Sequence, residues 1–358
     1  MNRPLPMLFF ALLAALLFAI AFPISTGGGY EFSPRYAASL EEGRLVSVYP
    51  APDSAQLPET LLAHSGDYLG YLDLANRQVR LSRRRAYGIA ATDWGFINYP
   101  EAPANLLVQS SYGEPLFSLG SEGFPFGRST GLFLLHADGY TLSEYDETGE
   151  RVWSVGEVTP VTAFDATPGA RAVGFLSGTL YLKEGEQEWQ ELRLPEAEAS
   201  VVYDLAFSHD GESLLVRSGL DPQSLTLYDL SGEEAQRRWT EEVDEPSVRS
   251  EALAVLSPAV VAVELAGGVE LRSHLDATPL DSYEEAGLGD AVYFPESRVA
   301  AYTLRRSGGG ETELRIFDEE RRPLFLGSGL PGDLRIFADG ALLVLASGET
   351  VAVVEVGP

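Results

Sequence analysis

The stretch from Leu142 to Val155, LSEYDETGERVWSV, contains the pattern that decides the fold. An apolar strand leads into a turn of Asp and Gly, and a second strand that carries a tryptophan follows it. The same hairpin returns at Leu225–Thr240 (LTLYDLSGEEAQRRWT) and at Leu314–Leu326 (LRIFDEERRPLFL). Short apolar runs bounded by Gly, Asp and Ser are typical of antiparallel strands. We therefore predict an all-β chain built from repeated hairpins.

A second type of hairpin marks the beginning of each repeat. Phe207–Val216 reads FSHDGESLLV, and Phe337–Val344 reads FADGALLV. The Asp-Gly dipeptide permits the positive φ angles of a tight hairpin turn. Set end to end, the repeats are about 40 residues long, which is the length of a four-stranded propeller blade. Eight repeats begin near Gly43, Ala86, Gly123, Pro160, Val202, Ser250, Gly289 and Pro331.

These repeats predict an eight-bladed β-propeller of four-stranded antiparallel sheets. Each sheet has two apolar faces that only neighbouring sheets bury, and a ring of sheets leaves few exposed edges. The last repeat has only three strands before Pro358, so we expect a strand near Tyr30–Pro34 to complete it. One helical turn is expected over Tyr36–Glu42. Seven blades are the alternative, if the first and last repeats are halves of one blade. A β-sandwich would give no such repeat.

Two of these motifs resemble known propeller repeats. FSHDGESLLV is similar to the F-S-x-D-G turn of WD40-like and related bacterial propellers. Tyr145–Trp153, YDETGERVW, resembles the D-x-x-T-G-x-x-x-W repeat of quinoprotein-like (PQQ-type) propellers, although its Asp-to-Thr spacing is one residue short. The resemblance covers roughly residues 43–358 and implies a disc used mostly as an interaction platform. The resemblance does not imply the activity of the quinone enzymes. Their metal ligands and the catalytic carboxylate of their central funnel are not recognisable in this sequence, so no cofactor is expected.

The N-terminal stretch Leu5–Ile24, LPMLFFALLAALLFAIAFPI, contains no charge. At 1.5 Å per residue it matches the ~30 Å hydrocarbon core of a bilayer. Arg3 precedes it, which favours a cytoplasmic N-terminus and export of the remainder. Its length favours an uncleaved signal-anchor over a cleaved signal peptide. We predict a transmembrane signal-anchor at 1–24, a linker with a ring-closing strand at 25–42, and a periplasmic propeller at 43–358.

The composition excludes several classes of function. The chain has 53 acidic and 25 basic residues, a formal net charge of −28, so its surface repels nucleic acid and anionic headgroups. It has no cysteine, which rules out disulfides, zinc-thiolate sites and a cysteine nucleophile. The four histidines are far apart, and no P-loop, calcium loop or G-x-S-x-G motif occurs. We therefore assign no catalytic, metal or cofactor-binding residue.

Four residues are candidates for contact with a partner. Trp94 is predicted at the turn of an inner strand, where an aromatic ring could face a partner. Arg83, Arg84 and Arg85 form the only basic run. The run either charges a blade edge or docks an acidic partner. The other tryptophans, Trp153, Trp189 and Trp239, are expected to pack between blades.

Together these features predict a membrane-anchored, extracytoplasmic propeller that binds or scaffolds a protein of the cell envelope and is not an enzyme. The alternative is a propeller-type hydrolase, for example a glycoside hydrolase. It would need two carboxyl groups about 5–10 Å apart in the central channel. A sensor is a further alternative, disfavoured because few residues precede Leu5 to serve as an output domain.

Overall fold

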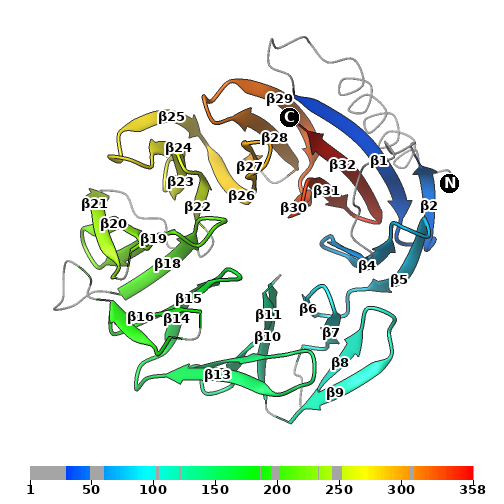
Figure 1. Cartoon of the computed structure of the whole chain (residues 1–358), viewed down its shortest axis with the longest axis horizontal. Helices are drawn as coiled ribbons and strands as arrows, with labels where there is room; N and C mark the ends of the chain where they lie inside the picture. Colours follow the sequence, from blue (N-terminus) through cyan, green and yellow to red (C-terminus); the bar gives the residue numbers. More distant parts are fainter. Residues whose placement is uncertain are drawn as a thin grey trace. The chain divides into compact units, whose positions relative to one another are not determined.

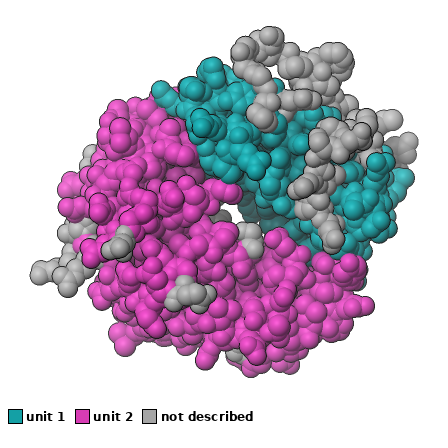
Figure 2. Space-filling view, in the orientation of Figure 1, with its two compact units in different colours: residues 1–83, 290–303, 310–358 teal, residues 84–289, 304–309 magenta. Residues whose placement is uncertain are grey.

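The computed structural model describes residues 30–48, 60–101, 105–120, 122–128, 130–185, 187–192, 194, 201–232, 234–243, 252–306 and 310–357. All regular elements in these ranges are β-strands, and they form eight sheets. The protein is an eight-bladed β-propeller, as the repeats predict. The seven-bladed alternative is wrong, because the first and last repeats form separate sheets. Contacts group the sheets into two compact units, coloured separately in Figure 2.

Unit 1 comprises residues 1–83, 290–303 and 310–358. Its three-stranded sheet consists of β3 (Leu61–His64), β4 (Tyr68–Asp73) and β5 (Gln78–Arg84). It also holds most of β26 (Ala286–Phe294), β27 (Val299–Arg306), β28 (Glu311–Asp318) and β29 (Pro323–Pro331). A five-stranded sheet has the order β2 (Arg44–Val48), β1 (Glu31–Ser39), β32 (Thr350–Gly357), β31 (Leu342–Ser347) and β30 (Arg335–Asp339).

Strand β1 joins the N-terminal part of the chain to its C-terminal sheet. It lies beside β32 and pairs with it antiparallel, from Glu31 opposite Gly357 to Ser39 opposite Thr350 (Figure 1). This confirms the strand expected near Tyr30–Pro34. The predicted helical turn over Tyr36–Glu42 is wrong, because residues 36–39 pair with β32 on one side and β2 on the other. The strand that completes the last sheet thus lies within residues 25–42, the segment predicted to contain it.

Unit 2 comprises residues 84–289 and 304–309 and contains five four-stranded sheets. The sheets follow one another in an arc, with the last strand of each at the outer rim (Figure 1). The strands, sheet by sheet, are β6 (Gly88–Ala91), β7 (Gly95–Tyr99), β8 (Leu106–Ser110), β9 (Pro115–Leu119); β10 (Gly123–Arg128), β11 (Gly131–His136), β12 (Thr141–Tyr145), β13 (Arg151–Gly156); β14 (Val161–Ala166), β15 (Ala170–Phe175), β16 (Leu180–Glu184), β17 (Gln190–Leu192); β18 (Val201–Phe207), β19 (Ser213–Gly219), β20 (Gln223–Asp229), β21 (Gln236–Val243); and β22 (Leu253–Ser257), β23 (Val260–Leu265), β24 (Gly268–Ser273), β25 (Pro279–Glu284).

The core of each unit lies between neighbouring sheets. One cluster in unit 2 joins the sheets of β6–β9 and β10–β13 through residues such as Ile97, Val108 and Leu134. Similar clusters follow between each later pair of sheets in the unit. In unit 1 two further clusters bury both faces of the sheet that contains β1 and β32. Burial of these faces, at roughly 25 cal/mol per Å² of apolar surface, drives the sheets to stack.

Aspartates on first strands add a polar link between consecutive sheets. Asp165 of β14 accepts a hydrogen bond from Phe207 N (2.8 Å), and Asp204 of β18 accepts one from Ala252 N (2.6 Å). In unit 1, Asp290 of β26 accepts one from Ile336 N at 3.1 Å. The carboxylate satisfies a backbone donor that the ladder leaves unpaired. The same device therefore fixes how one sheet meets the next in both units.

The signal-anchor predicted at 1–24 lies outside the described residues. Among those that are described, no helix is long and apolar enough to cross a membrane.

Candidate partner-binding surface

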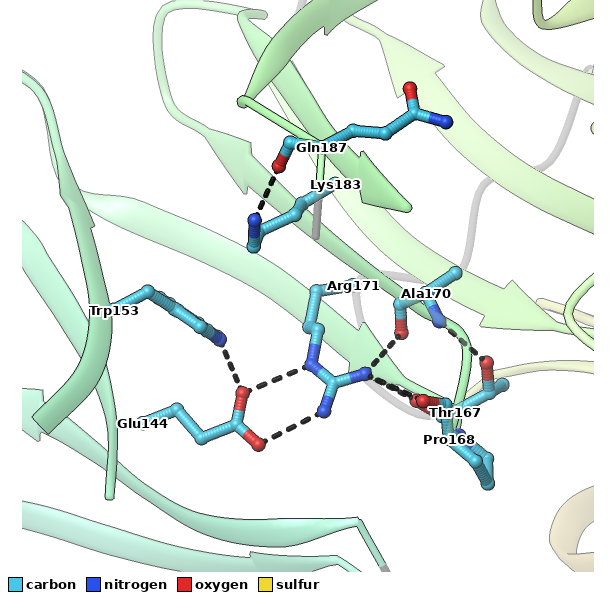
Figure 3. A network of polar contacts seen from close by, with 8 residues as sticks. All are labelled: Glu144, Trp153, Thr167, Pro168, Ala170, Arg171, Lys183 and Gln187. Atoms are coloured by element: carbon cyan, nitrogen blue, oxygen red, sulfur yellow. Dashed lines mark hydrogen bonds and ion pairs between the residues drawn. The ribbon is translucent and has the colours of Figure 1, made fainter. Parts of the chain in front are cut away.

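A buried ion pair holds Trp153 between two sheets of unit 2. Arg171 of β15 donates from Nε and Nη2 to the two carboxylate oxygens of Glu144 on β12, each at 3.0 Å (Figure 3). Trp153 Nε1 donates to the same carboxylate. The Trp153 ring also meets Trp189 edge-on at 5.0 Å between centroids. The two tryptophans thus pack between sheets, as expected from the repeat, and are not placed to stack on a ligand.

His274 and Trp239 form a comparable link between the β18–β21 and β22–β25 sheets. Trp239 Nε1 donates to the His274 carbonyl at 3.0 Å, and Arg238 Nη1 lies 2.9 Å from His274 Nδ1. A guanidinium only donates, so Nδ1 accepts and Nε2 carries the proton toward Ser213 Oγ at 3.1 Å. Burial, reinforced by the Arg238 charge, lowers the pKa of His274 to about 4. The proton sits on the nitrogen that faces the hydroxyl, so this pair is not arranged for general-base activation of Ser213.

The structure separates the residues that the sequence nominated for partner contact. Trp94 lies in the β6–β7 turn, half-buried, with its ring 6.3 Å from that of Phe117. Arg84 ends β5 and Arg85 follows it, both exposed, on the chain that enters β6. Trp94 and these two arginines therefore lie at opposite ends of β6. Arg83, also exposed, belongs to unit 1.

The turns of unit 2 alternate between two sides of the arc. Turns from the second to the third strand of a sheet, and the links from one sheet to the next, lie on one side, which we call the connection side. Turns from the first to the second strand and from the third to the fourth lie on the other, the hairpin side. Arg84, Arg85 and the exposed Tyr87 are on the connection side, and Trp94 is on the hairpin side.

Three exposed apolar residues lie on neighbouring loops of the connection side, and we call them the loop patch: Tyr140, Val158 and Leu176. Tyr140 is in the β11–β12 turn, Val158 in the β13–β14 link and Leu176 in the β15–β16 turn. Val158 is 93% exposed, and the other two are exposed as well. Exposed apolar residues scattered singly are normal, whereas a group on adjoining loops marks an interaction site.

Hydrogen bonds hold the three loops of the patch side by side. Glu157 N donates to Tyr140 O (3.3 Å), and Leu176 N donates to Pro160 O (2.9 Å). The Glu157 carboxylate accepts from Ser177 Oγ at 2.9 Å, which ties the middle loop to the third. The patch is therefore held in shape before any partner binds, which lowers the entropic cost of binding. Sequence reasoning missed it, because Val158 carries no motif and is singled out only by its exposure.

The hairpin side carries a second, smaller group around Trp94. Ser111 N donates to Trp94 O at 3.1 Å, which joins the β6–β7 turn to the β8–β9 turn. Tyr112, in the latter turn, is exposed. Trp94 itself is half-buried against the core that includes Ile97 and Leu106. Of its two aromatic residues only Tyr112 is exposed, whereas all three residues of the loop patch are exposed.

No metal site emerges from the described part of the chain, where no three His, Asp or Glu side chains gather. His136 bonds Ser143 at 2.9 Å, the His64 ring lies 4.4 Å from that of Phe337 in a tilted arrangement, and the exposed His209 is in a turn.

These features define a class: an all-β propeller in which buried polar contacts of tryptophan and histidine join neighbouring sheets. Comparison with protein families agrees, since the model of a family described as beta-propeller protein matches residues 2–238. The chain belongs to that family. A comparison with curated proteins gives no match.

Solved structures share the fold at low sequence identity. BamB from Moraxella catarrhalis has a TM-score of 0.56 and 12% identity, over 90% of this chain and 99% of that one. The computationally designed Ika8 protein has a TM-score of 0.56 and 14% identity, covering 84% and 94%. The C-terminal WD40 domain of Sif2 has a TM-score of 0.52 and 13% identity, covering 84% and 93%. At these identities the similarity shows the propeller fold alone.

Proposed function

We propose that this protein is a membrane-anchored, extracytoplasmic propeller that binds a protein partner of the cell envelope through its loop patch. The single observation that carries the proposal is the exposure of Val158, flanked by Tyr140 and Leu176 on loops tied together by hydrogen bonds. Exposure of these apolar side chains to water is unfavourable in free energy, and because the loops are held in place, contact with a partner is the way to bury them.

The connection side also supplies residues that interfaces favour. Arg84, Arg85 and Tyr87 are exposed on this side of unit 2. Arginine and tyrosine are enriched at interface hot spots. In a chain of net charge −28, this basic run would meet acidic groups of a partner and orient it on the apolar patch. In this proposal the loop patch supplies most of the affinity, and the arginines orient the partner.

Membrane anchoring and export are proposed from the sequence of Leu5–Ile24 and the position of Arg3. Two treatments of isolated membranes test them. The full chain should stay in the pellet after alkaline carbonate extraction, whereas a chain lacking residues 5–24 should be released. Added protease should digest the propeller from the extracytoplasmic side only. Release of the full chain by carbonate would contradict the anchor.

Affinity capture from detergent-solubilised membranes tests partner binding. Burial of one valine contributes about 1.5–3 kcal/mol, so V158D should weaken the complex roughly 10- to 100-fold and remove the partner from the eluate. Y112S, on the hairpin side, is the matched control and should retain the partner. Loss of the partner with Y112S but not with V158D would move the site to the other side. A chain that elutes alone and hydrolyses a glycoside would refute the proposal in favour of the hydrolase.

A further inference from the structure

Strand β10 presents aromatic side chains at the edge of its sheet. It is the first strand of its sheet and has a hydrogen-bonded neighbour on one side only, β11. Phe124 is 51% exposed and Phe126 is 40% exposed, while Gly123 before them and Pro125 between them are buried. In a propeller the first strand of a blade faces the central channel. The two phenylalanines are the exposed residues of β10, since the other residues of this strand are buried or half-buried. Large apolar side chains exposed on an inner strand indicate a binding surface.

The two faces of β10 differ in how tightly they pack. On one face, Gly127 meets the backbone of Ala91 in β6 so closely that a Cβ atom would lie 1.9 Å from Ala91 O. On the other face lie Phe124, Phe126 and Arg128, since alternate residues of a strand share a face. Phe126 is 6.2 Å from Phe164 of β14, centroid to centroid. The side toward β14 is therefore filled by rings rather than by close backbone contact.

Arg128 adds a cation to this aromatic group. Its guanidinium carbon lies 5.6 Å from the centre of the Phe164 ring. The Nε atom is buried and has no hydrogen-bond partner, and no described carboxylate forms an ion pair with the side chain. The half-buried Arg80 and Arg171, by contrast, each have a carboxylate partner. Among the described residues Arg128 therefore has no counter-ion, and its guanidinium could pair with an anionic group from outside.

We propose that this β10 surface, formed by Phe124, Phe126, Arg128 and Phe164, binds a segment of a partner protein that carries a large apolar side chain and a carboxylate. The apolar side chain would rest on Phe124 and Phe126, and the carboxylate would pair with the Arg128 guanidinium. At about 3.3 Å per residue, Phe124 and Arg128 are roughly 13 Å apart along the strand. An extended partner would therefore space its apolar and acidic residues two to four positions apart.

The charge of the protein argues against polyanionic occupants of this surface. The net charge of −28 repels nucleic acid and anionic lipid, and a single guanidinium beside three rings is too little charge for a polyanion. Aromatic rings next to an arginine suit an apolar and acidic peptide, since each carboxylate–guanidinium bond is strengthened by a partly dry setting. A fatty acid shares this chemistry and is an outcome of the test below.

Peptide display on the full chain in detergent tests the proposal. A library of random seven-residue peptides is selected on the wild-type protein and counter-selected on R128Q. The selection should enrich sequences with Phe, Trp or Leu two to four positions from Asp or Glu. A synthetic peptide of the consensus should bind R128Q on the order of tenfold more weakly than wild type. R128K should restore part of the affinity, and the exposed R151Q control should bind as wild type does.

Three results would overturn the inference: no enrichment over R128Q, a consensus without an acidic residue, or octanoate binding that depends on Arg128 while no peptide binds. The thermal melt of each variant shows that it is folded, and F124S provides a second variant that leaves Arg128 in place. V158D should bind the consensus peptide normally. Loss of the envelope partner with V158D therefore tests the loop patch, and loss of peptide binding with R128Q tests the β10 surface.

Discussion

Replacement of His274 by asparagine should remove much of the acid sensitivity of this propeller. His274 is 4% exposed and links Arg238 to Ser213 in its neutral form. Its pKa is about 4 in the folded protein, against 6.5 for a histidine exposed to water, mainly because burial disfavours the charged ring. Asparagine keeps an acceptor near the position of Nδ1 but does not titrate.

The magnitude follows from the difference between these two pKa values. Between pH 6.5 and pH 4 the unfolded chain binds a proton at His274 that the folded chain does not bind, so the free energy of unfolding falls as the pH falls. The contribution is fully present above pH 6.5 and lost by pH 4. At 1.36 kcal/mol per pKa unit, the total loss is about 3 kcal/mol, of which about 2 kcal/mol occurs by pH 5.

Urea denaturation followed by tryptophan fluorescence measures this contribution. Trp239 bonds the His274 carbonyl and reports on the same site. The free energy of unfolding of the wild type should fall about 2 kcal/mol more than that of H274N between pH 7 and pH 5. H209N, altered at an exposed turn, should fall as much as the wild type. Equal losses in the wild type and H274N would refute the reasoning.

Two further substitutions test how neighbouring sheets are joined. R171M removes the guanidinium and leaves the Glu144 carboxylate buried with only its bond from Trp153. Urea denaturation should show a loss of about 3–5 kcal/mol in the free energy of unfolding. A loss below about 1 kcal/mol would contradict a stabilising ion pair. G127A forces a Cβ atom against Ala91 O, so the melting temperature should drop by an amount equivalent to about 1–3 kcal/mol. G169A is the control, because a Cβ atom there meets nothing within 4 Å, and it should melt as the wild type does.

The sequence predicted where most of the sheets begin better than it predicted which strands pair with one another. Repeat starts placed at Gly123, Pro160 and Val202 fall within a residue of β10, β14 and β18. The start at Gly43 is wrong, because residues 44–48 form β2 and pair with β1, and the first sheet begins at Leu61. An apolar run predicts a strand but carries no information on which partner strand it meets. The pairing of β1 with β32 was predictable only because the last repeat lacked its fourth strand, whereas nothing in the sequence indicated that β2 pairs with β1.

The candidate surface was far less predictable than the fold. Trp94 drew attention as a tryptophan in a turn, yet the structure half-buries it, and the exposed Tyr112 lies in the neighbouring turn. Val158 sits in the unremarkable sequence GEVTP, and its role emerges only when three loops from two sheets lie together. Arg128 likewise differs from other arginines only in its surroundings. Exposure and the absence of a partner are properties of the folded chain.

Photocrosslinking in intact cells tests the central claim most directly. A photoreactive phenylalanine analogue at Val158 should crosslink the protein to one discrete envelope protein. The same analogue at Glu147, an exposed position on the hairpin side of the same sheet, should give no such product. A product at position 147 and none at position 158 would contradict partner binding through the loop patch.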